Sequence, residues 1–164
     1  MLQIAVLTIS DTRRLDNDSS GQTLVDRLRA AGHVLADRQL VPDNIYAIRA
    51  VVSGWIADAR TQVIISTGGT GVTGRDGTPE AIAPLLDKTL EGFGELFRSI
   101  SFGRIGTSAL QSRCLAGVAN GKYLFCLPGS VDACETGWDH ILKAQLDAGT
   151  RPCNFASILS RLKE

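Results

Sequence analysis

Short apolar runs alternate with longer segments of helical spacing in the first half of the chain. The apolar runs are almost continuous, which is typical of parallel strands that are buried on both faces. Between them, apolar residues recur at intervals of three and four, which predicts helices with one buried face. This order predicts an α/β fold with a mostly parallel sheet, because right-handed crossovers place helices on both of its faces. The predicted strands are residues 2–9, 34–41 and 63–66, and the predicted helices are residues 21–32, 45–59 and 79–86.

The second half of the chain follows a different pattern. Residues 90–102 have helical spacing, but glycines interrupt the segment, so a broken or bent helix is expected. Asn120-Gly121 lies between two apolar runs, which is the strongest short signal for a hairpin and predicts an antiparallel edge pair. These runs are residues 114–118 and 123–127. A helix is predicted at residues 131–146, with Ser130 as its cap. The tail, residues 150–164, is expected to pack on the body of the protein or on a neighbour.

Composition and charge exclude several classes of protein. Seventeen Lys and Arg residues balance 17 Asp and Glu residues, so no overall field favours nucleic acid as a partner. No apolar run approaches the ~18 residues that suggest a membrane span. Residues 1–4 lack a basic leader, so a cytoplasmic protein is expected. The 164 residues are enough for one domain with its own core.

The four cysteines do not form a metal-binding motif. They contain no Cys-x-x-Cys pair, and only two histidines accompany them, so a zinc site is not expected. Cys114 and Cys126 lie in apolar runs, where a thiol usually packs as a small hydrophobe. We therefore expect reduced, structural cysteines here and at Cys134 and Cys153.

A glycine-rich segment follows the third predicted strand and carries the clearest candidate chemistry. The segment contains Thr67, Gly68, Gly69, Thr70 and Gly71. It ends at a helix start, where Thr78 would cap, Pro79 suits the first helical position and Glu80 puts negative charge in the first turn. A strand, a glycine-rich turn and a helix in this order are typical of phosphate or anion sites, because glycine lets backbone N–H groups approach the ligand.

Asp76 lies inside this segment, next to Arg75. A carboxylate would repel a phosphate ligand unless a cation lay between them, and Mg²⁺ commonly takes oxygen ligands from one or two carboxylates and from phosphates. One hypothesis is therefore a nucleotide or phosphate-ester site with Asp76 as a metal ligand. The alternative is a tight surface turn with a solvated Arg-Asp pair. The segment matches neither the Walker A loop nor the dinucleotide-binding fingerprint.

Three further groups of polar residues follow predicted strands, at the end where ligands collect in open α/β sheets. Ser10 and Asp11 follow the first strand, although an ordinary polar turn is an equal alternative. Asp43 follows the second, where capping of the next helix is the favoured interpretation. Pro128-Gly129-Ser130 follows the last strand and gives a second candidate anion site.

These landmarks together resemble the molybdenum cofactor biosynthesis family, which includes the molybdopterin adenylyltransferases and the gephyrin G-domain. The resemblance covers essentially the whole chain, and residues 91–98 and 150–155 are closest to the B branch of the family. It implies a three-layer (αβα) fold, a single molybdopterin-binding domain over residues 1–164, and a homotrimer or homohexamer. The landmarks are residues 8–12, 18–21, 41–43, 66–71, 75–80 and 127–130.

The resemblance also implies a reaction. In the adenylyltransferases an aspartate at the position of Asp76 is required, and this chain retains it together with Asp43. The implied activity is Mg²⁺-dependent adenylyl transfer from ATP to the terminal phosphate of molybdopterin, with both aspartates as catalytic residues and metal ligands. The implied substrate-binding residues are Ser10, Asp11, Thr67, Gly68, Gly69, Thr70, Gly71, Ser108, Pro128, Gly129 and Ser130.

An alternative is a scaffold in the same pathway that binds molybdopterin or a nucleotide without catalysis. Such a scaffold would assemble with other molybdenum cofactor biosynthesis proteins. The retained aspartates favour the enzyme, and the B-type body favours the scaffold.

Overall fold

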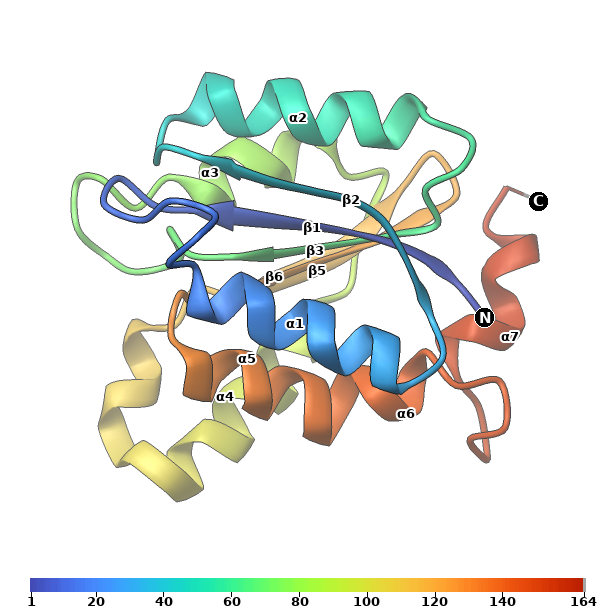
Figure 1. Ribbon diagram of the computed structural model, residues 1–164. Helices are drawn as coiled ribbons and strands as arrows, with labels where there is room; N and C mark the ends of the chain where they lie inside the picture. The colour runs from blue at the N-terminus through green and yellow to red at the C-terminus, as the bar shows by residue number, and fades with distance from the viewer. Residues whose placement is uncertain (164) are drawn as a thin grey trace.

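The computed structural model describes residues 1–163 and contains one six-stranded sheet in the order β2-β1-β3-β6-β5-β4 (Figure 1). The strands are β1 (Gln3–Ile9), β2 (Val34–Val41), β3 (Val63–Thr67), β4 (Lys88–Thr89), β5 (Leu115–Ala119) and β6 (Lys122–Leu127). The helices are α1 (Ser19–Ala30), α2 (Ile45–Ala57), α3 (Thr78–Ile82), α4 (Glu91–Ile105), α5 (Val131–Gly137), α6 (Lys143–Gln145) and α7 (Phe155–Ile158).

The strand pairing confirms the predicted mixed sheet. Strands β2, β1, β3 and β6 are parallel to one another, and β5 pairs antiparallel with both β6 and β4. The hairpin turn uses Asn120 and Gly121, whose φ angles are 47° and 71°. Positive φ at both positions matches the twist of the two strands, which is why Asn-Gly favours this turn. The two-residue strand β4 was not predicted, because its pattern is too short to recognise.

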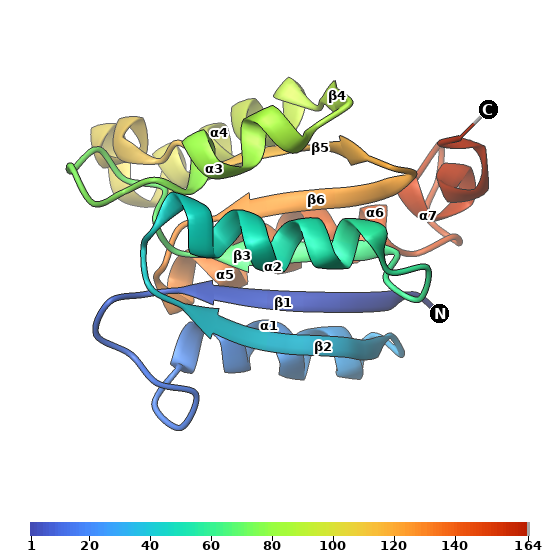
Figure 2. The ribbon, with the colours of Figure 1, turned by 90° about the horizontal axis from the view of Figure 1, so that it is seen from above.

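Helices cover both faces of the sheet and create two cores (Figures 1 and 2). One core lies between the sheet and helices α1, α4 and α5, and it includes Leu24, Phe97 and Trp138. The other lies under α2 and α3 and includes Ile48 and Ile82. Successive residues of β1 enter alternate cores, because side chains of a strand point to opposite faces. The three-layer αβα fold is confirmed.

One helix start and one helix cap differ from the prediction. Helix α1 begins at Ser19 rather than Gly21, because the Asp18 carboxylate accepts a hydrogen bond from the Gly21 amide at 2.9 Å and caps the first turn. Helix α2 is capped by Asn44, whose Oδ1 accepts from the amides of the first turn. The favoured interpretation of Asp43 as the cap of this helix is therefore wrong.

Helix α3 is shorter than predicted and is capped differently. Gly77 occupies the N-cap position, and no side chain caps the helix. Thr78 was predicted to cap, but its Oγ1 donates a hydrogen bond to the Gly68 carbonyl at 2.9 Å and so ties the helix to the glycine-rich segment. The predicted helix over residues 79–86 gives way after Ile82 to a 3₁₀ turn, Ala83–Leu85.

Helix α4 is continuous, so the predicted break within residues 90–102 is wrong. Gly94 lies against β5, where a Cβ would come within 2.8 Å of the Cys114 carbonyl oxygen. Glycine therefore serves close packing here and does not interrupt the helix.

The C-terminal part follows the prediction more closely. Ser130 caps α5, since its Oγ accepts from the Ala133 amide at 3.1 Å, and a π-helical turn, Trp138–Leu142, connects α5 to α6. Phe155 of the tail packs on the body, with its ring 4.7 Å from the Tyr123 ring. Glu164, the last residue of the predicted tail, lies outside the described residues.

Among residues 1–163, no helix combines the length and apolar character needed to cross a bilayer. Cys114, Cys126 and Cys134 are buried, whereas Cys153 is exposed, and all four are free thiols.

A buried carboxylate connects β1, β2 and α1. The Asp18 side chain is fully buried and accepts hydrogen bonds from Thr8 Oγ1 at 2.6 Å and from Arg38 Nη2 at 3.0 Å. Burial raises the pKa of Asp18, but the hydrogen bonds from Thr8 and Gly21 and the charge of Arg38 outweigh it, so the net pKa lies below the ordinary value of 3.8. The ionised form therefore stabilises the fold.

We expect Asp18→Asn to lower the free energy of unfolding by about 2–4 kcal/mol at pH 7, because Arg38 loses its buried partner. The pKa of Asp18 is lower in the folded than in the unfolded state, so this stabilisation is present above about pH 4 and is lost as pH falls through the folded value. Urea unfolding at pH 7 and pH 3 should show a smaller difference between the two proteins at pH 3. Asp26→Asn, an exposed change on the same helix, is the control. An equal difference at both pH values would contradict the role given to the ionised carboxylate.

Candidate functional site

The carboxyl ends of β1, β3 and β6 meet at one edge of the sheet, where the loops that follow them surround a cavity of about 410 Å³. Figure 2 shows these loops at the same end of the molecule. Ligands in open α/β sheets collect at this edge because the polypeptide leaves the sheet there and exposes backbone groups. The predicted site residues that line the cavity are Ser10, Gly68, Gly69, Thr70, Gly71, Asp76, Pro128, Gly129 and Ser130.

Two glycines allow the turn after β3 to lie against its neighbours. Gly68 and Gly69 have φ angles of 106° and 66°, which side-chain-bearing residues rarely adopt. A Cβ on Gly68 would also collide with the Ile9 carbonyl oxygen, and a Cβ on Gly129 would lie 3.1 Å from the Gly68 Cα. The backbones of the three loops are therefore in direct contact.

Thr67 does not line this cavity, although it was predicted to bind substrate. Its side chain is buried, and Oγ1 donates to the Pro128 carbonyl at 2.9 Å while it lies 3.1 Å from the Cys134 thiol. Thr67 thus joins the β3 loop to the β6 loop. Burial raises the pKa of Cys134 to about 11, so this thiol remains protonated near neutral pH.

Asp76 lies on the wall of the cavity in an ionised form. Its Oδ2 accepts hydrogen bonds from the Thr73 amide at 2.8 Å and from Thr73 Oγ1 at 2.7 Å. These bonds, the Thr73 hydroxyl first, outweigh the effect of burial and lower the pKa of Asp76. A Cβ on Gly71 would lie 2.7 Å from the same oxygen, so the carboxylate is held closely against the glycine-rich backbone.

Asp43 lies behind this backbone and outside the cavity lining. Its Oδ1 accepts from the Gly77 amide at 3.1 Å, and its Oδ2 would lie 2.6 Å from a Cβ on Gly69. Burial, followed by repulsion from Asp76 and Asp11, raises the pKa of Asp43 above its ordinary value. Three carboxylates from three loops therefore act on one another electrostatically.

Asp11 completes this acidic group but does not line the cavity. Its Oδ1 accepts from the Asp43 amide at 3.1 Å, and its Oδ2 pairs with Arg75 at 2.7 Å. The neighbouring Ser10 does line the cavity, and its Oγ accepts from the Arg13 amide at 3.1 Å. Both interpretations of this turn thus have support, since it is a hydrogen-bonded polar turn that also faces the cavity.

The donor set suits a hard cation. Asp76 and Asp43 offer carboxylate oxygens, and repulsion from Asp76 and Asp11 adds to burial in raising the pKa of Asp43, while the charge of Arg75 offsets part of this effect. Among residues 1–163, no three His, Cys, Asp or Glu side chains are arranged as a metal site. A magnesium ion fits because it needs only one or two carboxylates when substrate phosphates and water complete its shell.

The approach to β5 contributes residues that the sequence analysis missed. Gln111 and Ser112 line the cavity, whereas the predicted Ser108 is exposed and lies outside it. β5 is antiparallel to β6, so the start of β5 lies at the edge where β6 ends. The predicted hairpin was the signal that could have placed Gln111 and Ser112 here.

Comparison with known proteins gives consistent matches over most of the chain. A family model described as a probable molybdopterin binding domain matches residues 5–148. Molybdenum cofactor biosynthesis protein B of Escherichia coli (strain K12) is 54% identical over 153 residues, which cover 93% of this chain and 90% of that protein.

Two solved structures are also similar. A crystal structure of molybdenum cofactor biosynthesis protein B has a TM-score of 0.89 and 36% identity, and the match covers 99% of this chain and 96% of that one. The tungsten cofactor synthesizing protein MoaB from Pyrococcus furiosus has a TM-score of 0.83 and 31% identity, with 100% and 98% covered.

We expect Gly68→Ala to lower the free energy of unfolding by about 3 kcal/mol, because alanine is strained at this φ and collides with Ile9. Gly74→Ala is the matched control in the same segment, since no atom lies within 4 Å of a Cβ there. It should change stability by less than about 0.5 kcal/mol. Thermal and urea unfolding measure both. Equal stability of the two variants would show that the β3 turn can accommodate a side chain at Gly68.

Proposed function

This chain belongs to the molybdenum cofactor biosynthesis protein B family, and on that premise we propose that it transfers the adenylyl group of ATP to the terminal phosphate of molybdopterin. Participation in molybdenum cofactor biosynthesis follows from the family itself. The adenylyl transfer is the finer proposal, and its main support is the position of one ionised carboxylate, Asp76, on the wall of a cavity built from glycine backbone.

The proposed reaction exchanges one bond to phosphorus for another. An oxygen of the terminal phosphate of molybdopterin attacks the α-phosphorus of ATP, and the bond from that phosphorus to the pyrophosphate group breaks. The attacking phosphate is already anionic at pH 7, so the reaction does not depend on a general base. The main barrier is repulsion between anions, so the site must concentrate positive charge and backbone N–H groups around the phosphates.

The chain supplies groups suited to both tasks. The amides of Gly69 and Thr70 can donate to phosphate oxygens, as in other glycine-rich turns that precede a helix, whereas the Gly68 amide donates to the Leu127 carbonyl. Asp76, with Asp43 behind it, can hold Mg²⁺, which when bound supplies positive charge to the transferring phosphoryl group. The Ser130 hydroxyl and the Gln111 amide line the remaining wall and can orient the substrates.

We also propose that the protein is a cytoplasmic homotrimer or homohexamer that works with other molybdenum cofactor biosynthesis proteins. The support from the structure is a group of exposed apolar side chains at the end of α4 and just after it, where Phe102, Ile105 and Leu110 are 61%, 49% and 80% exposed. Apolar side chains at this density suit contact with a second protein surface.

An adenylyl-transfer assay tests the proposed function directly. Purified protein, molybdopterin, Mg²⁺ and labelled ATP should give pyrophosphate that depends on molybdopterin. Asp76→Ala should lower turnover roughly 100-fold or more, because a ligand for the charge-stabilising cation is lost. Its fold should persist, since Asp76 lies in an exposed segment and its bonds to Thr73 stabilise the protein by only about 1 kcal/mol.

The matched control is Asp58→Asn, which removes the carboxylate that pairs with Arg60 beyond the C-terminal end of α2. This variant should retain full turnover. Similar turnover of the wild type and Asp76→Ala would exclude the metal-ligand role. Binding of molybdopterin without pyrophosphate release would instead support the non-catalytic scaffold in the same pathway.

A further inference from the structure

Arg113 donates hydrogen bonds to three residues of the glycine-rich segment, although it is far away in sequence. It lies just before β5, and its backbone amide donates to the Thr70 carbonyl at 2.9 Å. Its side chain is 34% exposed, and the guanidinium donates from Nε to the Gly71 carbonyl at 2.6 Å and from Nη2 to the Asp76 carbonyl at 2.8 Å. Arg113 therefore contacts the segment in three places through backbone carbonyls alone.

The two carbonyls that the guanidinium bonds lie at the two ends of one exposed loop. Residues 72–75 are all exposed, and they connect Gly71 to Asp76. Inside the loop, the Asp76 amide donates to the Thr73 carbonyl at 3.1 Å, and the Thr73 amide donates to the Asp76 carboxylate. Because the guanidinium bridges both ends, it holds the loop in the conformation that places the Asp76 carboxylate on the cavity wall.

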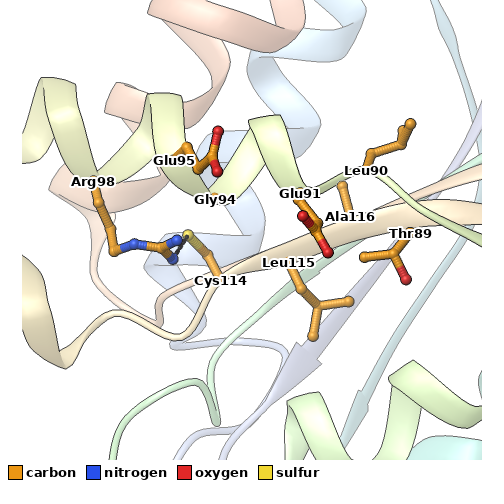
Figure 3. Close-up of a pocket in the computed structure, with 9 residues that line it drawn as sticks. All are labelled: Thr89, Leu90, Glu91, Gly94, Glu95, Arg98, Cys114, Leu115 and Ala116. Carbon is orange, nitrogen blue, oxygen red and sulfur yellow. Dashed lines mark hydrogen bonds between the residues drawn. The ribbon is translucent and has the colours of Figure 1, made fainter.

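The position of Arg113 is itself fixed from two sides. Glu80 of α3 pairs with its guanidinium. On the other side, Arg98 of α4 donates to the Ser112 carbonyl at 3.3 Å and lies 4.0 Å from the Cys114 sulfur. Figure 3 shows Arg98 reaching from α4 to Cys114 along the wall of a second cavity of about 310 Å³. Arg98 of α4 thus bonds the backbone of the residue before Arg113 and contacts the side chain of the residue after it.

We propose that Arg113 is a positioning residue that holds residues 72–76 closed and thereby places the Asp76 carboxylate for cation binding. The placement of Asp76 for cation binding rests on the proposed function, in which Asp76 is a metal ligand. The guanidinium bonds the carbonyl oxygen of Asp76 rather than the carboxylate, so it positions Asp76 through the loop backbone, and its charge also favours the ionised carboxylate.

The chemistry of arginine suits this role better than that of lysine. The planar guanidinium has several donors in a fixed fork, so one side chain can bond two carbonyls and a carboxylate together. A lysine ammonium keeps the charge but is a single point at the end of a flexible chain. The pair of variants Arg113→Lys and Arg113→Gln therefore separates the effect of the fork from the effect of the charge.

The experiment measures amide hydrogen exchange by NMR in the protein without added metal. The reporters are the amides of Thr73 and Asp76, whose hydrogen bonds close the loop. Both Arg113→Lys and Arg113→Gln should accelerate exchange at these amides roughly tenfold or more, since two charge-assisted hydrogen bonds are lost. The urea midpoint of global unfolding is measured in parallel, so local opening can be distinguished from loss of the fold.

Arg49→Lys is the matched control. Arg49 of α2 also donates to two backbone carbonyls, those of Ala81 and Glu80, at 3.1 and 2.9 Å, but it does not bond the loop. This variant should leave exchange at Thr73 and Asp76 unchanged. In the transfer assay, Arg113→Lys should raise the Mg²⁺ concentration for half-maximal turnover roughly tenfold, and Arg49→Lys should not.

Hydrogen exchange tests the role of Arg113, and the transfer assay tests the proposed function, so the two can fail separately. Exchange in Arg113→Lys at the wild-type rate would overturn the positioning role. If only Arg113→Gln accelerated exchange, the positive charge at this position, rather than the planar fork of arginine, would be what protects the loop. Equal acceleration in Arg49→Lys would also overturn it, because the effect would then be a general loosening. Accelerated exchange in a protein whose wild type shows no transfer would support the loop role and reject the proposed function.

Discussion

The close approach of three backbone turns at one edge of the sheet is the constraint on which the site depends. The Gly68 amide donates to the Leu127 carbonyl at 3.0 Å, while Gly68 itself packs against Ile9 and Gly129. No side chain fits between these turns, so the peptide groups of the glycines form part of the cavity wall beside the side chains of Asp76, Gln111 and Ser130. A parallel sheet makes this possible, because β1, β3 and β6 all end at the same edge.

The electrostatics of this edge fit the proposed transfer between anions. Asp11, Asp43 and Asp76 come from three different loops, and their mutual repulsion contributes to the raised pKa of Asp43. Such a group is unfavourable by itself but favourable for a cation that also binds phosphates. Arginines compensate at the periphery, where Arg75 pairs with Asp11 and Arg113 bonds the loop that carries Asp76.

Local pattern was sufficient to predict most of the fold and part of the site. The apolar runs gave the central strands, and Asn120-Gly121 gave the antiparallel hairpin, because both signals depend only on neighbouring residues. The resemblance to the molybdenum cofactor biosynthesis family is confirmed by the family match over residues 5–148. The glycine-rich segment, Asp76 and the Pro128-Gly129-Ser130 turn were placed together because each follows a strand of one parallel sheet.

The sequence by itself thus determined which strands and turns form and which edge of the sheet carries the polar residues. Only the tertiary structure decided what each polar side chain contacts. Asp18 and Thr67 became buried connectors, Asp43 bonded Gly77 instead of capping α2, and Arg113 reached a loop 37 positions away. The physical reason is that a hydrogen bond depends on distance in space, whereas hydrophobic periodicity and turn preference depend on distance along the chain.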